Sequence, residues 1–527
     1  MMPSRTTRFS LLAVALSVLL TACGVNPVTK KKEIQFVSEA QELQIGEKNY
    51  SPTRQGEGGD LTVLPELTTY VNGVGQKLAA VSDRKLPYEF VVLNNSVPNA
   101  WALPGGKIAV NRGLLYELQN EAELAAVLGH EIVHAAARHG AKAQERGTMM
   151  QIGMQAAQIG AAVGGIDPNL ANLALQGAGT GLQMVQMKYG RDQELESDHY
   201  GMKYMKAAGY DPQGAVTLQE TFVRLSQQES AKKQGWLDGL FASHPPSTER
   251  VADNKRTADE LGRGGEIGEE KFAARMKSLR AIEPAYAKYD QALAAARKKD
   301  FSSARSLAEE ATRLLPKEGR FQELLGEISL AQKQPQEALP YYQKAIDLNS
   351  DYFGSYLGAG VAQFQAGNHA KAEEWLTKSA QLLPTAPAAY YLGTIAREHG
   401  DRAKAMEYYR AAAGSQSRIG EMAAAEFVRM DLPQNPDKYV AAAGQFDSQG
   451  RLLVVLQNRA PVPLRDFQVT PVLVDGNGRI LQQASPVRVG AVLKPGEQVA
   501  AASGIGNIQQ QQLPYLRFRV DGARIAE

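Results

Sequence analysis

Apolar residues along positions 61–139 follow two different periods. In residues 67–81 and 120–139 they recur three and four positions apart, which predicts two helices with one apolar face each. Residues 88–94 and 107–110 are short runs rich in β-branched or aromatic side chains, and they predict two strands. The pattern therefore predicts a mainly helical domain that contains a small β-sheet.

Helical spacing also extends to both sides of this region. It predicts one helix over about 37–50, followed by a Gly-rich loop at 55–60, and another over about 181–208. Between these elements, residues 147–187 carry a single charge and are rich in Gly, Ala, Gln and Met. This uncharged segment either covers a cleft as a lid or forms buried helices, and its pattern does not separate the two.

A repeat with a period of 34 residues occupies the region after about residue 283. Ala304, Ala338 and Ala372 are spaced by this period, which is typical of tetratricopeptide helix pairs with small residues where the helices cross. We expect an α-α superhelix over 283–432; the alternative is a non-repetitive helical domain. The predicted units are 285–316, 319–350, 353–384 and 387–418.

Residues 440–527 change to a strand pattern. Residues 452–456, 467–474 and 516–520 are apolar runs of strand length, and the Asp-Gly-Asn-Gly sequence at 475–478 is a hairpin turn signal. We expect a small β-sandwich-like domain here.

The first 22 residues have the layout of a secretory signal peptide. Arg5 and Arg8 precede an apolar run over 9–20, which is shorter than the roughly 20 residues of a membrane-spanning helix. Cys23 follows Leu-Thr-Ala, a sequence that resembles a bacterial lipobox. We expect residues 1–22 to be removed and Cys23 to carry a lipid; the alternative is an ordinary signal peptide followed by an unrelated cysteine.

Composition excludes several classes of protein. Cys23 is the only cysteine of the 527 residues, which excludes a disulfide scaffold and a Cys-rich metal site. The net charge of +2 gives no reason to expect a nucleic-acid partner.

The sequence His130-Glu131-Ile132-Val133-His134 carries the clearest chemistry. On a helix, residues four apart lie on the same face, so both imidazoles can bind one zinc ion. Glu131 lies about 100° around the helix, beside the metal, where it can accept a proton from a water molecule. Asn120 and Glu123 have the spacing of a capping box, which favours an ordered helix over a chance occurrence of the motif.

A catalytic zinc site needs a third protein ligand. Glu194 is the candidate in the acidic run that follows, with Glu196 as its competitor. Asp198 lies one turn after Glu194 and is placed to orient a histidine ligand.

Together these motifs resemble the zinc metallopeptidases of the HtpX and CAAX-prenyl-protease type. Residues 99–108 and 111–115 resemble the stretch before the zinc helix, and the Ser-His-Pro-Pro sequence ending in Arg at 243–250 resembles a downstream element of that family. Asn-Pro-Val-Thr at 26–29 and the repeats narrow the resemblance to periplasmic BepA-like proteins. It covers 24–262 closely and 283–415 loosely, and it does not cover 440–527.

The resemblance implies a gluzincin-like fold with one zinc ion per chain, bound by His130, His134 and Glu194. It implies that Glu131 is the general base and that Asp198 supports the site. His244 is implied to approach the zinc from a loop, either as a fourth ligand that keeps the enzyme latent or as a group that stabilises the oxyanion. Arg250 is then expected to anchor that loop or to pair with a carboxylate of the site, whereas we interpret His139 as structural.

Five segments follow from these interpretations. Residues 23–60 are expected to form a lipid tether with one helix, 61–262 the metallopeptidase, 263–282 a linker, 283–432 the repeats and 440–527 the β domain. An unfolded substrate is expected to pair with the strand formed by Lys107, Ile108, Ala109 and Val110; the alternative is that this strand is internal, with both edges occupied.

The resemblance also implies a role. It implies an endopeptidase that degrades misfolded or misassembled envelope proteins in the periplasm, held by lipid to the inner leaflet of the outer membrane, with the β-barrel assembly machinery as a partner of the repeats. The alternative is a chaperone or assembly adaptor whose protease site is latent most of the time.

Overall fold

The computed structural model describes residues 23–35, 37–142, 188–232 and 243–526. The chain divides into two compact units, one made of residues 1–367 with 381–383 and the other of 368–380 with 384–527. The predicted signal peptide at 1–22 and most of the uncharged segment at 147–187 lie outside the described residues. None of the described helices is both long and apolar enough to cross a membrane.

A three-stranded sheet lies at the centre of the first unit. Its strands are β3 (Glu89–Leu93), β4 (Ala100–Leu103) and β5 (Lys107–Asn111), in the order β3-β5-β4. Strand β5 runs parallel to β3 and antiparallel to β4. The predicted strands at 88–94 and 107–110 are confirmed, and β4 was not predicted.

This order corrects one expectation. Both edges of β5 are occupied, so Lys107, Ile108, Ala109 and Val110 cannot pair with a substrate strand. All five residues of β5 are buried, and the ammonium of Lys107 pairs with Glu47 and Glu89.

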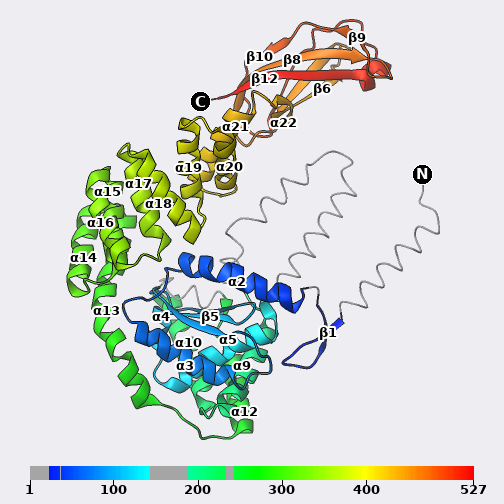
Figure 1. The fold of residues 1–527 in the computed structure, drawn as a ribbon. Coiled ribbons are helices and arrows are strands. Elements are labelled where there is room, and N and C mark those ends of the chain that lie inside the picture. The colour runs from blue at the N-terminus through cyan, green and yellow to red at the C-terminus, as the bar shows by residue number, and fades with distance from the viewer. Residues whose placement is uncertain (1–22, 36, 143–187, 233–242, 527) are drawn as a thin grey trace, which may run out of the picture. The chain divides into compact units, whose positions relative to one another are not determined.

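Helices cover both faces of the sheet (Figure 1). Helix α2 (Glu39–Gly56) packs through Tyr50 against Trp101 and Ala109. On the other face, Ala100, Ile108 and Val110 join one core with α3 (Pro65–Ala79) and α5 (Glu121–Ala136). Side chains alternate along a strand, so every second residue meets each layer.

The N-terminal segment differs from the predicted tether. Strands β1 (Cys23–Val25) and β2 (Lys32–Ile34) form an antiparallel hairpin, and the Asn26 side chain closes its turn. Helix α2 continues to Gly56, past the predicted end at about residue 50 and into the predicted Gly-rich loop. Residues 23–60 therefore fold onto the peptidase instead of hanging from it.

Among the described residues of the domain, four further helices accompany α5: α4 (Arg112–Glu117), α9 (Arg191–Ala207), α10 (Gln213–Lys232) and α12 (Thr248–Leu261). Asn120 caps α5 by accepting a hydrogen bond from the Glu123 backbone N–H, as predicted. The predicted helix over 181–208 is wrong at its start, because residues 188–190 are not helical and Gly190 precedes the first turn of α9.

The predicted linker at 263–282 is wrong from Glu269 on. Helix α13 (Glu269–Arg297) begins there, and Phe272, Met276 and Leu279 are buried in the core shared with the peptidase. Residue Lys271 of the same helix pairs with Glu121 at the start of α5. The apolar spacing of 272, 276 and 279 is helical, and this signal could have replaced the linker by a helix.

Helix pairs follow α13, as the repeat predicts. In the first unit they are α14 (Phe301–Leu314), α15 (Gly319–Ala331), α16 (Pro335–Leu348) and α17 (Phe353–Gln365). Gly326 and Gly358 lie against the ring of Tyr342, where a β-carbon would clash. The second unit contains most of α18 (His369–Leu382) and all of α19 (Ala386–Glu398), α20 (Arg402–Ala413), α21 (Arg418–Asp431) and α22 (Pro436–Tyr439).

The C-terminal domain consists of two small sheets with one core. Strands β6 (Val440–Phe446), β7 (Leu452–Asn458) and β11 (Gln498–Ala502) form one, and β8 (Leu464–Val474), β9 (Ile480–Gln483), β10 (Val487–Val489) and β12 (Leu516–Ile525) form the other. Val454 and Leu456 from the first sheet share a core with Phe467 and Val469 from the second. The predicted sandwich-like domain is thereby confirmed.

Candidate metal centre

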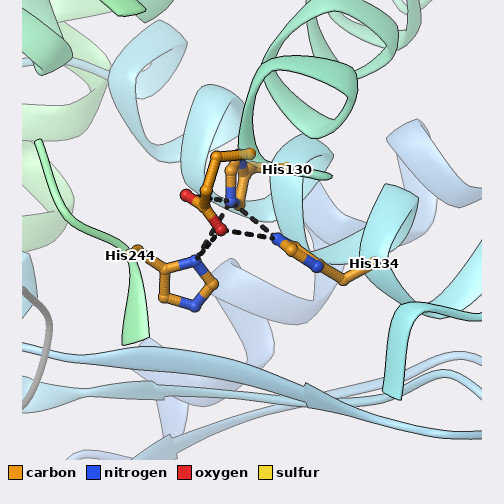
Figure 2. Close-up of side chains that lie close together, drawn as sticks. His130, His134 and His244 are labelled. Atoms are coloured by element: carbon orange, nitrogen blue, oxygen red, sulfur yellow. Dashed lines mark hydrogen bonds and ion pairs between the residues drawn. The ribbon is translucent and has the colours of Figure 1, made fainter. Parts of the chain in front are cut away.

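Helix α5 places His130 and His134 one turn apart on the same face. Their Nε2 atoms are 2.9 Å apart, and both side chains are buried (Figure 2). Two imidazole nitrogens this close can both bind a single cation.

Helix α9 crosses α5 and supplies the carboxylate. Glu194 Oε1 lies 3.4 Å from His134 Nε2, and Glu194 Oε2 lies 3.6 Å from His130 Nε2. The close approach of the helices depends on Gly129 and Gly201, whose backbones nearly touch. Glu196 points away from the cluster and contacts His139, so the structure brings Glu194 to the histidines and not its competitor.

His244 completes the cluster from the segment before α12. Its Nδ1 atom lies 3.0 Å from Glu194 Oε1 and 3.3 Å from His130 Nε2, and its Nε2 atom lies 3.7 Å from Glu131 Oε1. One ligand atom each from His130, His134, Glu194 and His244 lie within 4.8 Å of one another (Figure 2).

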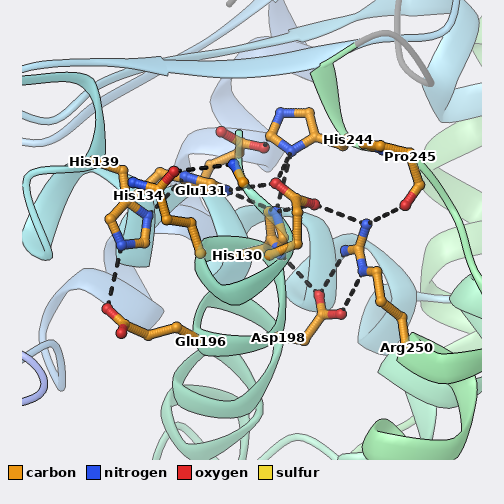
Figure 3. A network of polar contacts seen from close by, with 12 residues as sticks. His130, Glu131, His134, His139, Glu196, Asp198, His244, Pro245 and Arg250 are labelled. Atoms are coloured by element: carbon orange, nitrogen blue, oxygen red, sulfur yellow. Dashed lines mark hydrogen bonds and ion pairs between the residues drawn. The ribbon is translucent and has the colours of Figure 1, made fainter. Parts of the chain in front are cut away.

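Arg250 ties this cluster to its surroundings (Figure 3). It donates from Nε and Nη2 to both oxygens of Asp198, at 2.7 and 2.8 Å, and its Nη1 lies 2.8 Å from Glu194 Oε2. The same Nη1 donates to the carbonyl of Pro245, next to His244. Arg250 thus contacts both the segment that carries His244 and carboxylates of the site, which were the two alternatives given for it.

Asp198 in turn orients the first histidine. Its Oδ1 lies 2.8 Å from His130 Nδ1. A hydrogen bond at Nδ1 leaves Nε2 of the same ring free to face the cluster. Figure 3 shows His130 between Asp198 and the centre of the site.

Burial and charge set the ionisation of these groups. Burial alone would raise the pKa of Glu194, but His244 and His130 hold that pKa well below its ordinary value. Burial also opposes the charged form of Asp198, whose pKa is nevertheless lowered by Arg250. Desolvation raises the pKa of Glu131 and lowers the pKa of His134 well below its ordinary value. The site therefore combines ionised Glu194 and Asp198, a neutral His134 and a Glu131 that is more basic than an exposed glutamate.

These donors fit a zinc ion. His nitrogens and a carboxylate oxygen are the ligands that catalytic zinc sites use. Glu131 Oε2 is buried and has no hydrogen-bond partner among the described residues. A buried oxygen of this kind needs a partner that the described side chains do not supply, and a water molecule next to a bound metal would provide one.

Two residues beside the cluster were not expected to belong to it. The Tyr189 ring centroid lies 3.9 Å from that of His134, and His139 Nδ1 lies 3.0 Å from His134 Nδ1. Burial lowers the pKa of His139. The spacing of His139 from the motif was visible in the sequence, whereas nothing marked Tyr189. Cys23 begins strand β1 and is not one of the residues of the cluster.

Comparison with known proteins gives a family for this domain. Residues 65–258 match the model of peptidase family M48, and residues 289–353 and 329–394 match tetratricopeptide repeat models. The chain is 29% identical over 231 residues to the beta-barrel assembly-enhancing protease of Escherichia coli (strain K12), covering 43% of this chain and 45% of that protein. The match thus spans less than half the length of that relative.

Two further relatives match this chain over different lengths. The protein of the same name from Yersinia pestis is 25% identical over 67% of this chain and 76% of its own length. The mitochondrial metalloendopeptidase OMA1 of Schizosaccharomyces pombe is 32% identical over 43% of this chain and 63% of its own length. The metal-ligand cluster and these matches agree: this chain contains an M48 peptidase domain followed by tetratricopeptide repeats.

Proposed function

We propose that this protein is a zinc metalloendopeptidase of the cell envelope that degrades misfolded or misassembled envelope proteins. The observation that carries the proposal is the buried cluster of His130, His134 and Glu194, with the Glu131 carboxylate beside it. Its M48 domain supports peptide-bond hydrolysis as the reaction.

The chemistry follows from how these groups are held. A zinc ion bound by His130, His134 and Glu194 would polarise the attacking water and the scissile carbonyl. Glu131 accepts the proton of the water and later gives it to the leaving amine, for which its raised pKa is suited. Asp198 and Arg250 keep His130 and Glu194 oriented through the bonds described above.

His244 has two candidate roles. Its contact with Glu194 and its place in the cluster support a fourth ligand that keeps the enzyme latent. Its position 3.7 Å from Glu131 supports a donor that stabilises the oxyanion instead.

The substrate strand is proposed to pair with β4 instead of β5. Within the described residues, β4 pairs with β5 alone and so lies at the edge of the sheet. Ala100 of β4 lines a cavity of about 40 Å³ together with His130 and Glu131. An extended peptide along this edge would be held by main-chain hydrogen bonds, without strong dependence on its sequence.

The binding partners and the cellular location of this protein are proposed from its relatives and from its sequence. The names of two relatives support a link to β-barrel assembly, and the repeats are suited to hold peptides or partner proteins. We propose a lipid at Cys23 that holds the protein at the inner leaflet of the outer membrane. A Cys23→Ser variant that stays in the membrane fraction would contradict this anchor. The second candidate function is a chaperone or adaptor with a latent protease.

The test is cleavage of an unfolded model protein by the zinc-loaded chain from residue 24 onward. Glu131→Gln removes the base and should lower the rate by about 10²–10⁴-fold, whereas His199→Gln, on α9 outside the cluster, is the matched control. Faster cleavage by His244→Ala would identify a latent ligand, and loss of cleavage a catalytic group. If the unmodified chain binds zinc and cleaves nothing, the adaptor is the better model.

A further inference from the structure

A chain of hydrogen bonds lies behind the second histidine of the cluster. His134 Nδ1 is 3.0 Å from His139 Nδ1, and His139 Nε2 is 3.2 Å from Glu196 Oε1 (Figure 3). The His139 side chain is 1% exposed, so the bond between the two imidazoles is shielded from solvent, whereas the Glu196 side chain is 21% exposed. Neither His139 nor Glu196 contributes a ligand atom to the metal cluster.

The order of donors and acceptors in this chain is fixed by His134. Its Nε2 faces His130 and Glu194, and it can offer a lone pair there only if the ring proton is on Nδ1. Nδ1–H must then donate to His139 Nδ1, because two protonated nitrogens cannot share a 3.0 Å contact. His139 therefore carries its own proton on Nε2 and donates it to Glu196. Every donor meets an acceptor, and one tautomer of His134 is selected.

The backbone places His139 behind His134. In a continued helix, the fifth residue on would lie about 140° around the axis and could not reach the ring. Helix α5 ends at Ala136, and Arg138 adopts a left-handed conformation with φ of 62°. This conformation is costly for a residue other than Gly, so it must be supported by its neighbours.

The N-terminal segment supplies that support. Arg138 Nε donates to Glu42 Oε2 at 3.0 Å, and its Nη2 donates to the carbonyl of Val37. The amide of Asn26 donates to the carbonyl of Ala137. The reversal that presents His139 to His134 is thus held by residues that follow Cys23 closely.

From these contacts we infer that His139 and Glu196 are positioning residues for the metal site: they hold the His134 ring in the tautomer and orientation that turn Nε2 toward the ion. They do for His134 what Asp198 does for His130. The inference rests on the proposed zinc site. Partners of this kind change metal affinity by about 10–100-fold when they are removed.

The experiment measures zinc affinity of the metal-free full chain by competition with a chromophoric chelator. His139→Leu should weaken zinc binding by about 10–100-fold. His139→Asn keeps an acceptor near the position of Nδ1 and should recover most of that loss. Glu196→Leu should weaken binding less than His139→Leu does, because it leaves the first bond of the chain intact.

The matched control is His199→Leu, which removes a half-buried imidazole from α9 whose Nδ1 contacts Thr257. It should bind zinc as the unmodified chain does. Circular dichroism of each metal-free variant shows whether it folds, and Glu196→Leu carries the test if His139→Leu does not fold. Zinc affinity equal to that of the unmodified chain in a folded His139→Leu, or in a folded Glu196→Leu where His139→Leu does not fold, would overturn the inference alone. Failure of the unmodified chain to bind zinc would overturn the proposed function as well.

Discussion

Two buried arginines of the first unit lie against carboxylates, and the carboxylates respond in opposite ways. Arg250 donates through two nitrogens to both oxygens of Asp198, whose pKa is lowered in spite of its burial. Arg320, in helix α15 of the repeats, places its Nε 3.2 Å from Glu323 Oε2. Burial raises the pKa of Glu323 to about 8, and Arg320 offsets this only in part.

Geometry and neighbouring charge explain the difference. The fork of Arg250 matches the carboxylate plane, and its remaining nitrogen meets Glu194. Arg320 instead lies over the ring of Tyr352 and donates to the hydroxyl of Tyr289, and Glu327 adds negative charge near Glu323. A buried carboxylate thus stays charged where both partners of the ion pair have their hydrogen bonds satisfied. The metal site requires this charge, and the repeat does not.

The largest effect is expected from Arg250→Met. It leaves the charges of Asp198 and Glu194 buried without their cation, so we expect unfolding to become easier by about 3–5 kcal/mol. Urea unfolding of the metal-free chain measures this. Arg320→Met is the matched control and should cost clearly less, because a protonated Glu323 leaves no bare charge. An equal loss of unfolding free energy in the two variants would contradict the difference between the two ion pairs.

A smaller effect concerns pH. Glu323 keeps its proton in the folded state up to a pKa of about 8, whereas in the unfolded chain its pKa is the ordinary 4.5. The stability that this group contributes is therefore fully present below pH 4.5 and is lost as pH rises through about 8. The slope is at most about 1.4 kcal/mol per pH unit. Glu323→Gln should remove it from urea unfolding measured between pH 5 and 8, and the exposed Glu309→Gln should not. An unchanged slope in Glu323→Gln would show that Arg320 holds Glu323 ionised.

The smallest effect is expected at Glu121, where α13 meets the zinc helix. Lys271 Nζ lies 2.7 Å from Glu121 Oε1, but half of the lysine side chain is exposed, and the hydroxyls of Tyr70 and Tyr210 also donate to this carboxylate. Lys271→Gln should therefore cost less than about 1 kcal/mol in urea unfolding. Tyr210→Phe removes a buried donor and should lower stability more than Lys271→Gln does. The reverse order would mean that Glu121, like Asp198, depends mainly on its cation.

Local patterns were sufficient for several elements. Helical spacing and the Asn120 cap predicted α5, and the 34-residue period predicted the repeats. The interior position of β5 was only the alternative, and the helix that replaced the linker and the edge strand β4 were not predicted, because strand order depends on which distant segments pair. A run of apolar residues is equally compatible with either place in a sheet.

The sequence by itself determined the chemistry that is available: two histidines and a glutamate on one helix, a carboxylate downstream and a histidine before α12. The placement of the two histidines and the glutamate depends on spacing within one helix, which the period of the helix fixes. Only the tertiary structure decided between Glu194 and Glu196, and only the left-handed turn at Arg138 brought His139 behind His134. The physical reason is that such contacts depend on how two helices cross and where the chain reverses, and these are set by packing of residues far apart in the sequence.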